Sequence, residues 1–169
     1  MNNNSNYTNR NKPVTNVTWY DTSNFCDKLN SLCENVLPNN YYFALPTEDE
    51  WKYACRAGSQ TIIYEFKGIN NKVPIGCELF KIAWYKKNSE GKTHNVGEKL
   101  PNDWGVYDMI GNVWEWCDDS DENNDDLKII RGGCSRLKAK QCRCTSRALL
   151  PINSKDLFTG FRIVLIRKE

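Results

Sequence analysis

Residues 101–119 read PNDWGVYDMIGNVWEWCDD, and this dense run of aromatic, glycine and acidic residues decides the fold. Two segments precede it, PVTNVTWYDTSNFCDKL (13–29) and LPTEDEWKYACRAG (45–58). A C-terminal region follows it, which opens with IIRGGCS (129–135) and closes with CRCTSRALLPINSKDLFTGFRIVL (142–165). The most specific motifs in these segments are GNVWEW, RGG and GFR.

The composition indicates one soluble-type domain with a real core. The chain has 169 residues, of which 40% are apolar, and this length suits a single domain. Its 21 acidic residues nearly balance 23 basic ones, for a net charge of +2. That balance does not call for a nucleic acid or a membrane as a partner. The locally basic stretch 131–147 is interpreted as a solvated face rather than a phosphate site.

No targeting or spanning segment stands out in the sequence. No stretch is long and apolar enough to cross a bilayer, and the Asn-rich N-terminus lacks the apolar core of a signal peptide. As written, the sequence predicts a cytoplasmic protein. A piece cut from a longer secreted chain would look the same.

Local patterns predict two helices. Apolar residues at helical spacing predict a helix from Asp21 to Cys33, capped by Asp21 or Thr22. Thr47 and Glu50 form a capping box for a second helix, which Gly58 closes.

The rest of the chain is less regular. Residues 1–12 are predicted to be a disordered Asn-rich tail before a single domain at 13–169. Residues 59–106 show no strong periodicity, and 118–126 read as an acidic surface loop. Strands are expected at Lys128–Arg131 and Phe161–Ile166.

The four segments together resemble the sulfatase-modifying-factor family, which includes the formylglycine-generating enzymes and the variable proteins of diversity-generating retroelements. The resemblance runs from about Pro13 to Leu165. It implies an α+β, C-type-lectin-like fold, with two helices packed on small antiparallel sheets and much irregular structure. The strands that usually precede the PVTNVTW segment in this family are missing, so we expect a partner or a second copy to cover this N-terminal edge.

The resemblance also implies a structural calcium site in DMIGNVWE. Asp108 and Glu115 would supply carboxylates, and Gly111 and Val113 would supply backbone carbonyls. Hard oxygens on an irregular turn are what calcium prefers. The alternative is that Asp108 merely caps a turn.

The cysteines decide between catalysis and binding. Formylglycine-generating members hold copper with two cysteines placed after the RGG-type turn. Here Leu137 stands near the first position and no cysteine stands at the second, so a copper site would need Cys134 and Cys142 instead. The resemblance implies disulfides Cys55–Cys144 and Cys117–Cys142, or buried thiols in a reducing compartment. Cys26 is expected to be a core thiol, and Cys33 and Cys77 match no family position.

The favoured function is a non-catalytic module that displays residues 134–159 to a protein or small-molecule ligand. The resemblance to variable proteins carries this interpretation, since rigid scaffolds with irregular loops suit binding. The candidate contact residues are Arg136, Lys138, Lys140, Gln141, Arg143, Thr145, Ser146, Leu149, Ile152 and Phe158. The alternative is a copper-dependent, formylglycine-generating-type oxidase that acts on a cysteine of a protein substrate.

Overall fold

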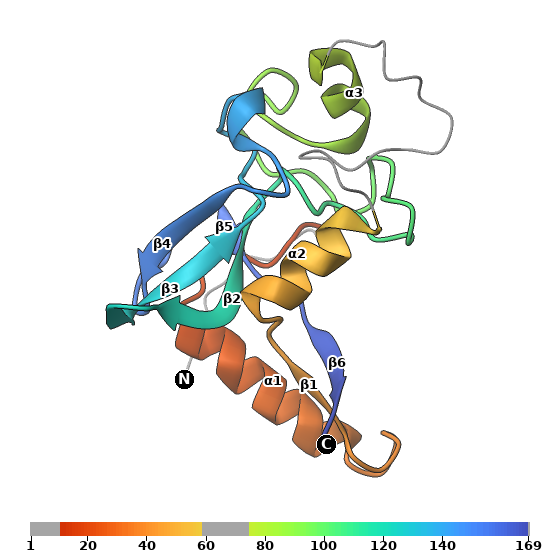
Figure 1. Ribbon diagram of the computed structural model, residues 1–169, viewed down its shortest axis with the longest axis vertical. Coiled ribbons are helices and arrows are strands. Elements are labelled where there is room, and N and C mark those ends of the chain that lie inside the picture. The colour runs from red at the N-terminus through yellow and green to blue at the C-terminus, as the bar shows by residue number, and fades with distance from the viewer. Residues whose placement is uncertain (1–10, 59–74, 169) are drawn as a thin grey trace.

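The computed structural model describes residues 11–58 and 75–168, with only the backbone of residues 75–78. Its elements are α1 (Trp19–Cys33), β1 (Tyr41–Ala44), α2 (Glu48–Arg56), α3 (Ile75–Ile82), β2 (Trp114–Asp121), β3 (Asn124–Arg131), the 3-10 helix η1 (Ala139–Gln141), β4 (Arg147–Pro151), β5 (Thr159–Gly160) and β6 (Val164–Arg167). This is the predicted α+β class, with small sheets and much irregular chain (Figure 1). A search of the described helices finds none with the length and apolarity needed to cross a membrane.

Both long helices begin with a capping box. The Thr47 hydroxyl accepts from the Glu50 N–H at 3.2 Å and the Glu50 carboxylate accepts from the Thr47 N–H at 2.8 Å, as predicted. In α1 the same exchange joins Thr18 and Asp21. The helix therefore starts at Trp19 rather than Asp21, because Thr18 is the cap and Asp21 is its partner in the first turn.

The strands form one four-stranded sheet and one two-stranded sheet. The order in the larger sheet is β4-β3-β2-β5, with β2 antiparallel to β3 and parallel to β5. The smaller sheet pairs β1 with β6. Residues 118–126, expected to be a loop, are the end of β2, a turn and the start of β3. Their charge does not oppose a strand here because most of these side chains face solvent at the tip of the hairpin.

Alternation along the strands places core side chains on both faces of the larger sheet. Cys117 and Ile129 join the main core with Trp51 of α2. Their neighbours Trp116 and Ile130 join a second core with Cys26 of α1. The sheet is therefore covered by α2 on one face and α1 on the other, and Cys26 is a buried core thiol as expected.

Two further sequence expectations differ from the structure. Helix α3 lies in the stretch that showed no strong periodicity, so the described chain has a third α-helix. Residues 1–10 of the predicted disordered tail lie outside the described residues. Asn11 is placed, however, because its carbonyl accepts from the Val96 N–H at 2.8 Å.

A buried carboxylate joins three distant segments. Trp51 Nε1 and Arg162 Nε both donate to Glu115 Oε2 at 2.6 Å, and Arg162 Nη2 donates to Glu115 Oε1 at 2.7 Å. The Glu115 side chain is 6% exposed. Arg162 belongs to the GFR motif, and close packing also explains the glycine of this motif. A Cβ on Gly160 would collide with the Val14 carbonyl.

Replacing Arg162 with Met tests this contact. The variant leaves the Glu115 charge buried beside the Trp51 indole alone, so the free energy of unfolding should fall by about 3–5 kcal/mol. Urea denaturation measures it. The matched control is Lys52→Met at the surface Lys52–Asp49 pair, in which Asp49 is exposed and Lys52 partly exposed; it should leave the unfolding midpoint nearly unchanged. Equal losses of unfolding free energy in the two variants would show that the buried Glu115–Arg162 pair stabilises the fold no more than the Lys52–Asp49 pair does.

Candidate functional site

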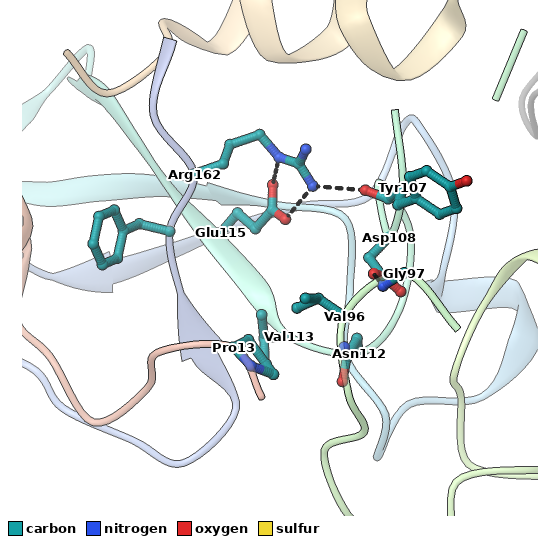
Figure 2. Close-up of a pocket in the computed structure, with 10 residues that line it drawn as sticks. Pro13, Val96, Gly97, Tyr107, Asp108, Asn112, Val113, Glu115 and Arg162 are labelled. Atoms are coloured by element: carbon teal, nitrogen blue, oxygen red, sulfur yellow. Dashed lines mark hydrogen bonds and ion pairs between the residues drawn. The ribbon is translucent and has the colours of Figure 1, made fainter. Parts of the chain in front are cut away.

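A pocket of about 360 Å³ opens beside the start of β2. Figure 2 shows Asp108, Glu115 and Arg162 among the residues that line it, together with Val96 and Tyr107. Val96 and Tyr107 are 54% and 45% exposed, whereas both carboxylates are buried. The pocket thus has an apolar and aromatic rim and a negatively charged interior.

Asp108 has an unsatisfied oxygen in this pocket. Its Oδ2 accepts from the Gly97 N–H at 2.7 Å, but its buried Oδ1 has no hydrogen-bond partner among the described residues. Burial raises the pKa of Asp108, the Gly97 N–H partly offsets this, and the nearby Glu115 charge raises it further. A buried carboxylate oxygen without a partner is costly unless a proton or a cation satisfies it.

The turn that carries Asp108 is tightly constrained. Asp108, Gly111 and Asn112 all have left-handed backbone angles, with φ of 55°, 77° and 55°. A side chain at Gly111 would collide with the Trp84 carbonyl, which also accepts from the Asn112 N–H at 2.8 Å. The turn therefore needs glycine at 111 and holds Asp108 against β2.

This donor set fits a calcium ion in its chemistry. Asp108 Oδ1 is available, and Glu115 Oε1 accepts one hydrogen bond, which leaves it a further lone pair. The described residues contain no group of three or more His, Cys, Asp or Glu side chains placed to hold a metal. Backbone oxygens, expected from Gly111 and Val113, would have to complete the shell.

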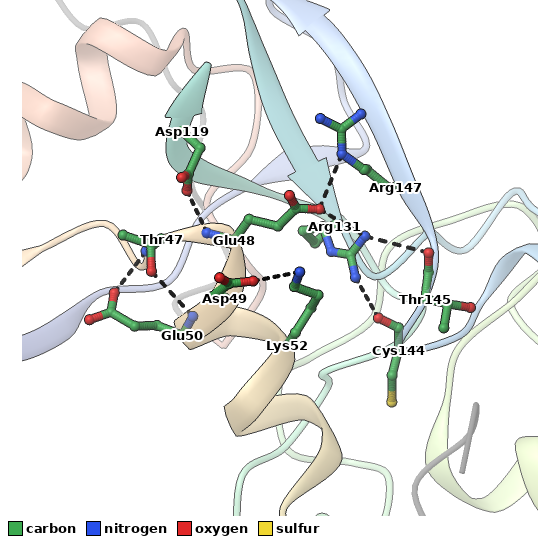
Figure 3. Close-up of polar contacts among 10 residues, drawn as sticks. All are labelled: Thr47, Glu48, Asp49, Glu50, Lys52, Asp119, Arg131, Cys144, Thr145 and Arg147. Carbon is green, nitrogen blue, oxygen red and sulfur yellow. Dashed lines mark hydrogen bonds and ion pairs between the residues drawn. The ribbon is translucent and has the colours of Figure 1, made fainter. Parts of the chain in front are cut away.

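The predicted contact loop is anchored at its base by arginines. Arg131 Nη2 donates to the Cys144 carbonyl at 2.6 Å, and Arg131 Nη1 lies 3.3 Å from the Glu48 carboxylate. Arg147 Nε donates to the same Glu48 oxygen at 3.1 Å, as Figure 3 shows. Arg131 is buried, and its guanidinium links the Glu48 carboxylate of α2 to two carbonyls of the loop. These bonds hold irregular loop backbone in place.

The structure sorts the ten predicted contact residues by exposure. Arg136, Lys138, Lys140, Gln141 and Thr145 are exposed, Arg143, Ser146, Leu149 and Phe158 are half-buried, and Ile152 is buried. Ile152 therefore leaves the contact set, because its side chain is only 9% exposed. Leu149 packs against the main core, and Phe158 lies beneath the Arg136 guanidinium at 4.3 Å. The apolar members thus support the loop, and the polar members face solvent.

The two cysteines of the possible copper pair are buried. Cys134 is 4% and Cys142 0% exposed, and the Cys142 thiol donates to the Cys134 carbonyl at 3.5 Å. Burial raises the pKa of both thiols, that of Cys142 to about 12, so both are protonated at neutral pH. Leu137, near the family's first copper position, packs against the main core.

Of the two implied disulfide pairs, one is in contact. The Cys55 and Cys144 sulfur atoms lie 2.7 Å apart between α2 and the loop. Cys117 and Cys142 are buried in the same core but stand as separate thiols. The side chain of Cys77 lies outside the described residues. Both disulfides stay predictions.

The sequence patterns did not predict that a second segment borders the loop. The Lys86 N–H donates to the Leu137 carbonyl at 2.9 Å, and the Ser89 hydroxyl donates to the Ser135 carbonyl at 2.6 Å. These bonds place the exposed Lys86 and Lys87 beside the loop. The pair of adjacent lysines was visible in the sequence, but its position depends on tertiary contacts.

Comparison with known proteins places the chain. The model of the sulfatase-modifying factor enzyme 1-like domain matches residues 2–167. The mouse formylglycine-generating enzyme is 30% identical over 90% of this chain and 44% of its own length. The bovine inactive C-alpha-formylglycine-generating enzyme 2 is 31% identical over 71% of this chain and 37% of its own. The chain therefore spans less than half the length of these two relatives.

Solved structures agree with the sequence relatives. Treponema denticola variable protein 1 superposes with a TM-score of 0.80 at 27% identity, over 99% of this chain and 76% of that one. PvdO from Pseudomonas aeruginosa gives a TM-score of 0.76 at 25% identity, over 94% of this chain and 63% of that one. With the family model matching nearly every residue, the chain belongs to the sulfatase-modifying factor enzyme 1-like family.

Proposed function

We propose that the chain is a non-catalytic binding module that presents residues 134–159 on a C-type-lectin-like scaffold. The observation that carries the proposal is the burial of Cys134 and Cys142 in a loop whose polar side chains are exposed. Copper chemistry of the formylglycine-generating type needs accessible thiolates, and a protonated, enclosed thiol is a poor ligand and nucleophile. The same loop offers a ligand several exposed side chains.

The anchoring of the loop supports a binding role. Arg131 holds two of its carbonyls, and the turn at Lys86 and Ser89 holds two more. A loop fixed in this way loses little conformational entropy when a ligand binds, which favours affinity. The similarity to Treponema denticola variable protein 1 is in keeping with such a scaffold.

The second candidate is an oxidase that uses Cys134 and Cys142 with copper. Its support is the family itself, which includes formylglycine-generating enzymes, and the contact between the Cys142 thiol and the Cys134 backbone. It requires the loop to open so that both sulfurs reach solvent. The bovine relative named as inactive indicates that the fold also exists without this activity.

Thiol accessibility separates the two functions. In native protein at pH 8, Cys134 and Cys142 should resist a thiol reagent until guanidinium is added, because both thiols are buried and burial raises the pKa of each. For Cys142, a pKa of about 12 lowers the thiolate fraction roughly a thousandfold relative to a free cysteine. Mass mapping of each labelled cysteine measures this. Cys33, which is partly exposed, is the internal positive control, and Cys33→Ser should remove its signal. Fast native labelling of both cysteines, with protection by one equivalent of Cu(I), would favour the oxidase.

A structural calcium ion is a further part of the proposal. Asp108 and Glu115 would bind it through their free carboxylate lone pairs, and Gly111 and Val113 through backbone oxygens. The ion would neutralise the buried Asp108 charge that no described side chain pairs. Its role would be to fix the 108–115 turn against β2, with no part in a reaction.

Calcium titration of the wild type and Asp108→Asn tests this site. For the wild type, calcium at a hundred times its Kd should stabilise the fold by about 2.7 kcal/mol, a Tm rise of about 5–10 °C. Asp108→Asn should lose this response. Without calcium it should be at least as stable as the wild type, since it removes an unpaired buried charge. Differential scanning calorimetry with EDTA and with magnesium provides the controls. An equal calcium response in both proteins would rule out Asp108 as a ligand.

A further inference from the structure

Two basic segments far apart in the sequence form one surface. The turn after Trp84 carries Lys86 and Lys87, and it is bonded to the loop through the Lys86 N–H and the Ser89 hydroxyl. The loop contributes Arg136, Lys138, Lys140 and Arg143. We call these six residues the basic face. Five of them are exposed and Arg143 is partly exposed.

No acidic side chain within its two segments offsets the positive charge of the basic face. Residues 79–89 and 134–147 contain no Asp or Glu, and Glu90, which follows directly, pairs with Lys92. Within the described part of the chain, none of the six side chains makes an ion pair. The one specific contact is that of Arg136 with the Phe158 ring. Like charges held together on a rigid surface repel one another, so a complementary anion would relieve the repulsion.

Six of the 21 acidic residues lie at the other end of the larger sheet. The β2–β3 hairpin carries them in residues 118–126, whereas strand β3 runs from this hairpin toward Arg131 and the loop. Figure 1 shows the hairpin turn and the short blue helix η1 at opposite ends of the strands. The acidic hairpin therefore does not offset the charge of the basic face, although the net charge of the chain is only +2.

The side chains around the basic face favour an acidic polypeptide over other anions. Single-stranded nucleic acids are bound by exposed aromatic rings that stack on bases, and membranes by apolar side chains that insert. In 79–89 and 134–147 the one large exposed hydrophobic residue is Phe80, which lines a separate cavity with Lys99 and Leu100. Beyond these segments, the exposed Leu157 and the half-buried Phe158 ring, which Arg136 covers, are too few to form a stacking or inserting surface. Flexible lysines with nearby Gln141 and Thr145 suit scattered carboxylates.

We propose that the basic face binds an acidic segment of a partner protein. This rests on the proposed binding function and names the chemistry of its partner. A second copy of this chain could offer its own acidic hairpin, but that head-to-tail contact would build rings or open chains of molecules. A different protein with a run of Asp and Glu avoids this.

Fluorescence anisotropy with a labelled ten-residue glutamate peptide tests the proposal. The wild type should bind it, and binding should weaken as the Debye length falls from about 10 Å at 0.1 M salt to about 3 Å at 1 M. The variant K86Q/K87Q/K138Q/K140Q should bind at least about fivefold more weakly, since each of the four exposed pairs contributes a factor of roughly 1.5 to 5. The control K12Q/K28Q/R167Q/K168Q removes the same number of charges elsewhere on the exposed surface and should bind like the wild type.

Each other outcome overturns the inference. Equal loss in both variants would indicate attraction by net charge alone. Tighter binding of a labelled 20-base single strand or of phosphatidylserine vesicles would assign the face to another anion, and salt-sensitive self-association in sedimentation velocity would assign it to a second copy. Absence of peptide binding would reject the acidic partner, while the thiol-labelling result on Cys134 and Cys142 would still decide the binding-module proposal independently.

Discussion

Glu115 accepts hydrogen bonds from Trp51 and Arg162 where almost no water reaches it. Its carboxylate fixes helix α2, strand β2 and the segment after β5 at a single point. A buried charge that is this well paired tolerates little displacement, because any movement leaves it unsatisfied. The Asp108 turn lies directly before this point on the chain. Its geometry, and the pocket that it lines, therefore depend on the Glu115 contacts.

Irregular backbone has no neighbouring strand to bond with, so its carbonyls need other hydrogen-bond donors. In the loop after Gly133, Arg131 supplies donors to the carbonyls of Cys144 and Thr145, and Glu48 links Arg131 to Arg147. These anchors lie beneath the loop rather than on it. Substitutions at the exposed positions of the loop therefore change what it can contact without removing what holds it. A surface of this kind can be adapted to different ligands on one scaffold.

Local signals predicted much of the fold. The Thr47–Glu50 capping box is carried by a few neighbouring residues, and it appears as expected. The start of α1 was misplaced because Thr18, Asp21 and Thr22 can each cap a helix, and packing decides among them. The acidic strand ends were misassigned because charge resembles a loop signal. Lys86 could not be placed beside Leu137, since only tertiary hydrogen bonds join them.

The candidate site could also be predicted only in part, because some of its residues are neighbours in the sequence and others meet only in the folded chain. Asp108 and Glu115 share one short motif, so sequence brings them together, whereas the burial of Cys142 and Ile152 depends on how a long loop folds back. Burial also separates two kinds of binding in this molecule. The enclosed Asp108 carboxylate acts over a short distance and suits a small ion that loses its water. The exposed lysines are screened beyond about a Debye length, so they need a partner that brings many charges at once. A rigid pocket and a charged surface can thus serve different ligands in one small domain.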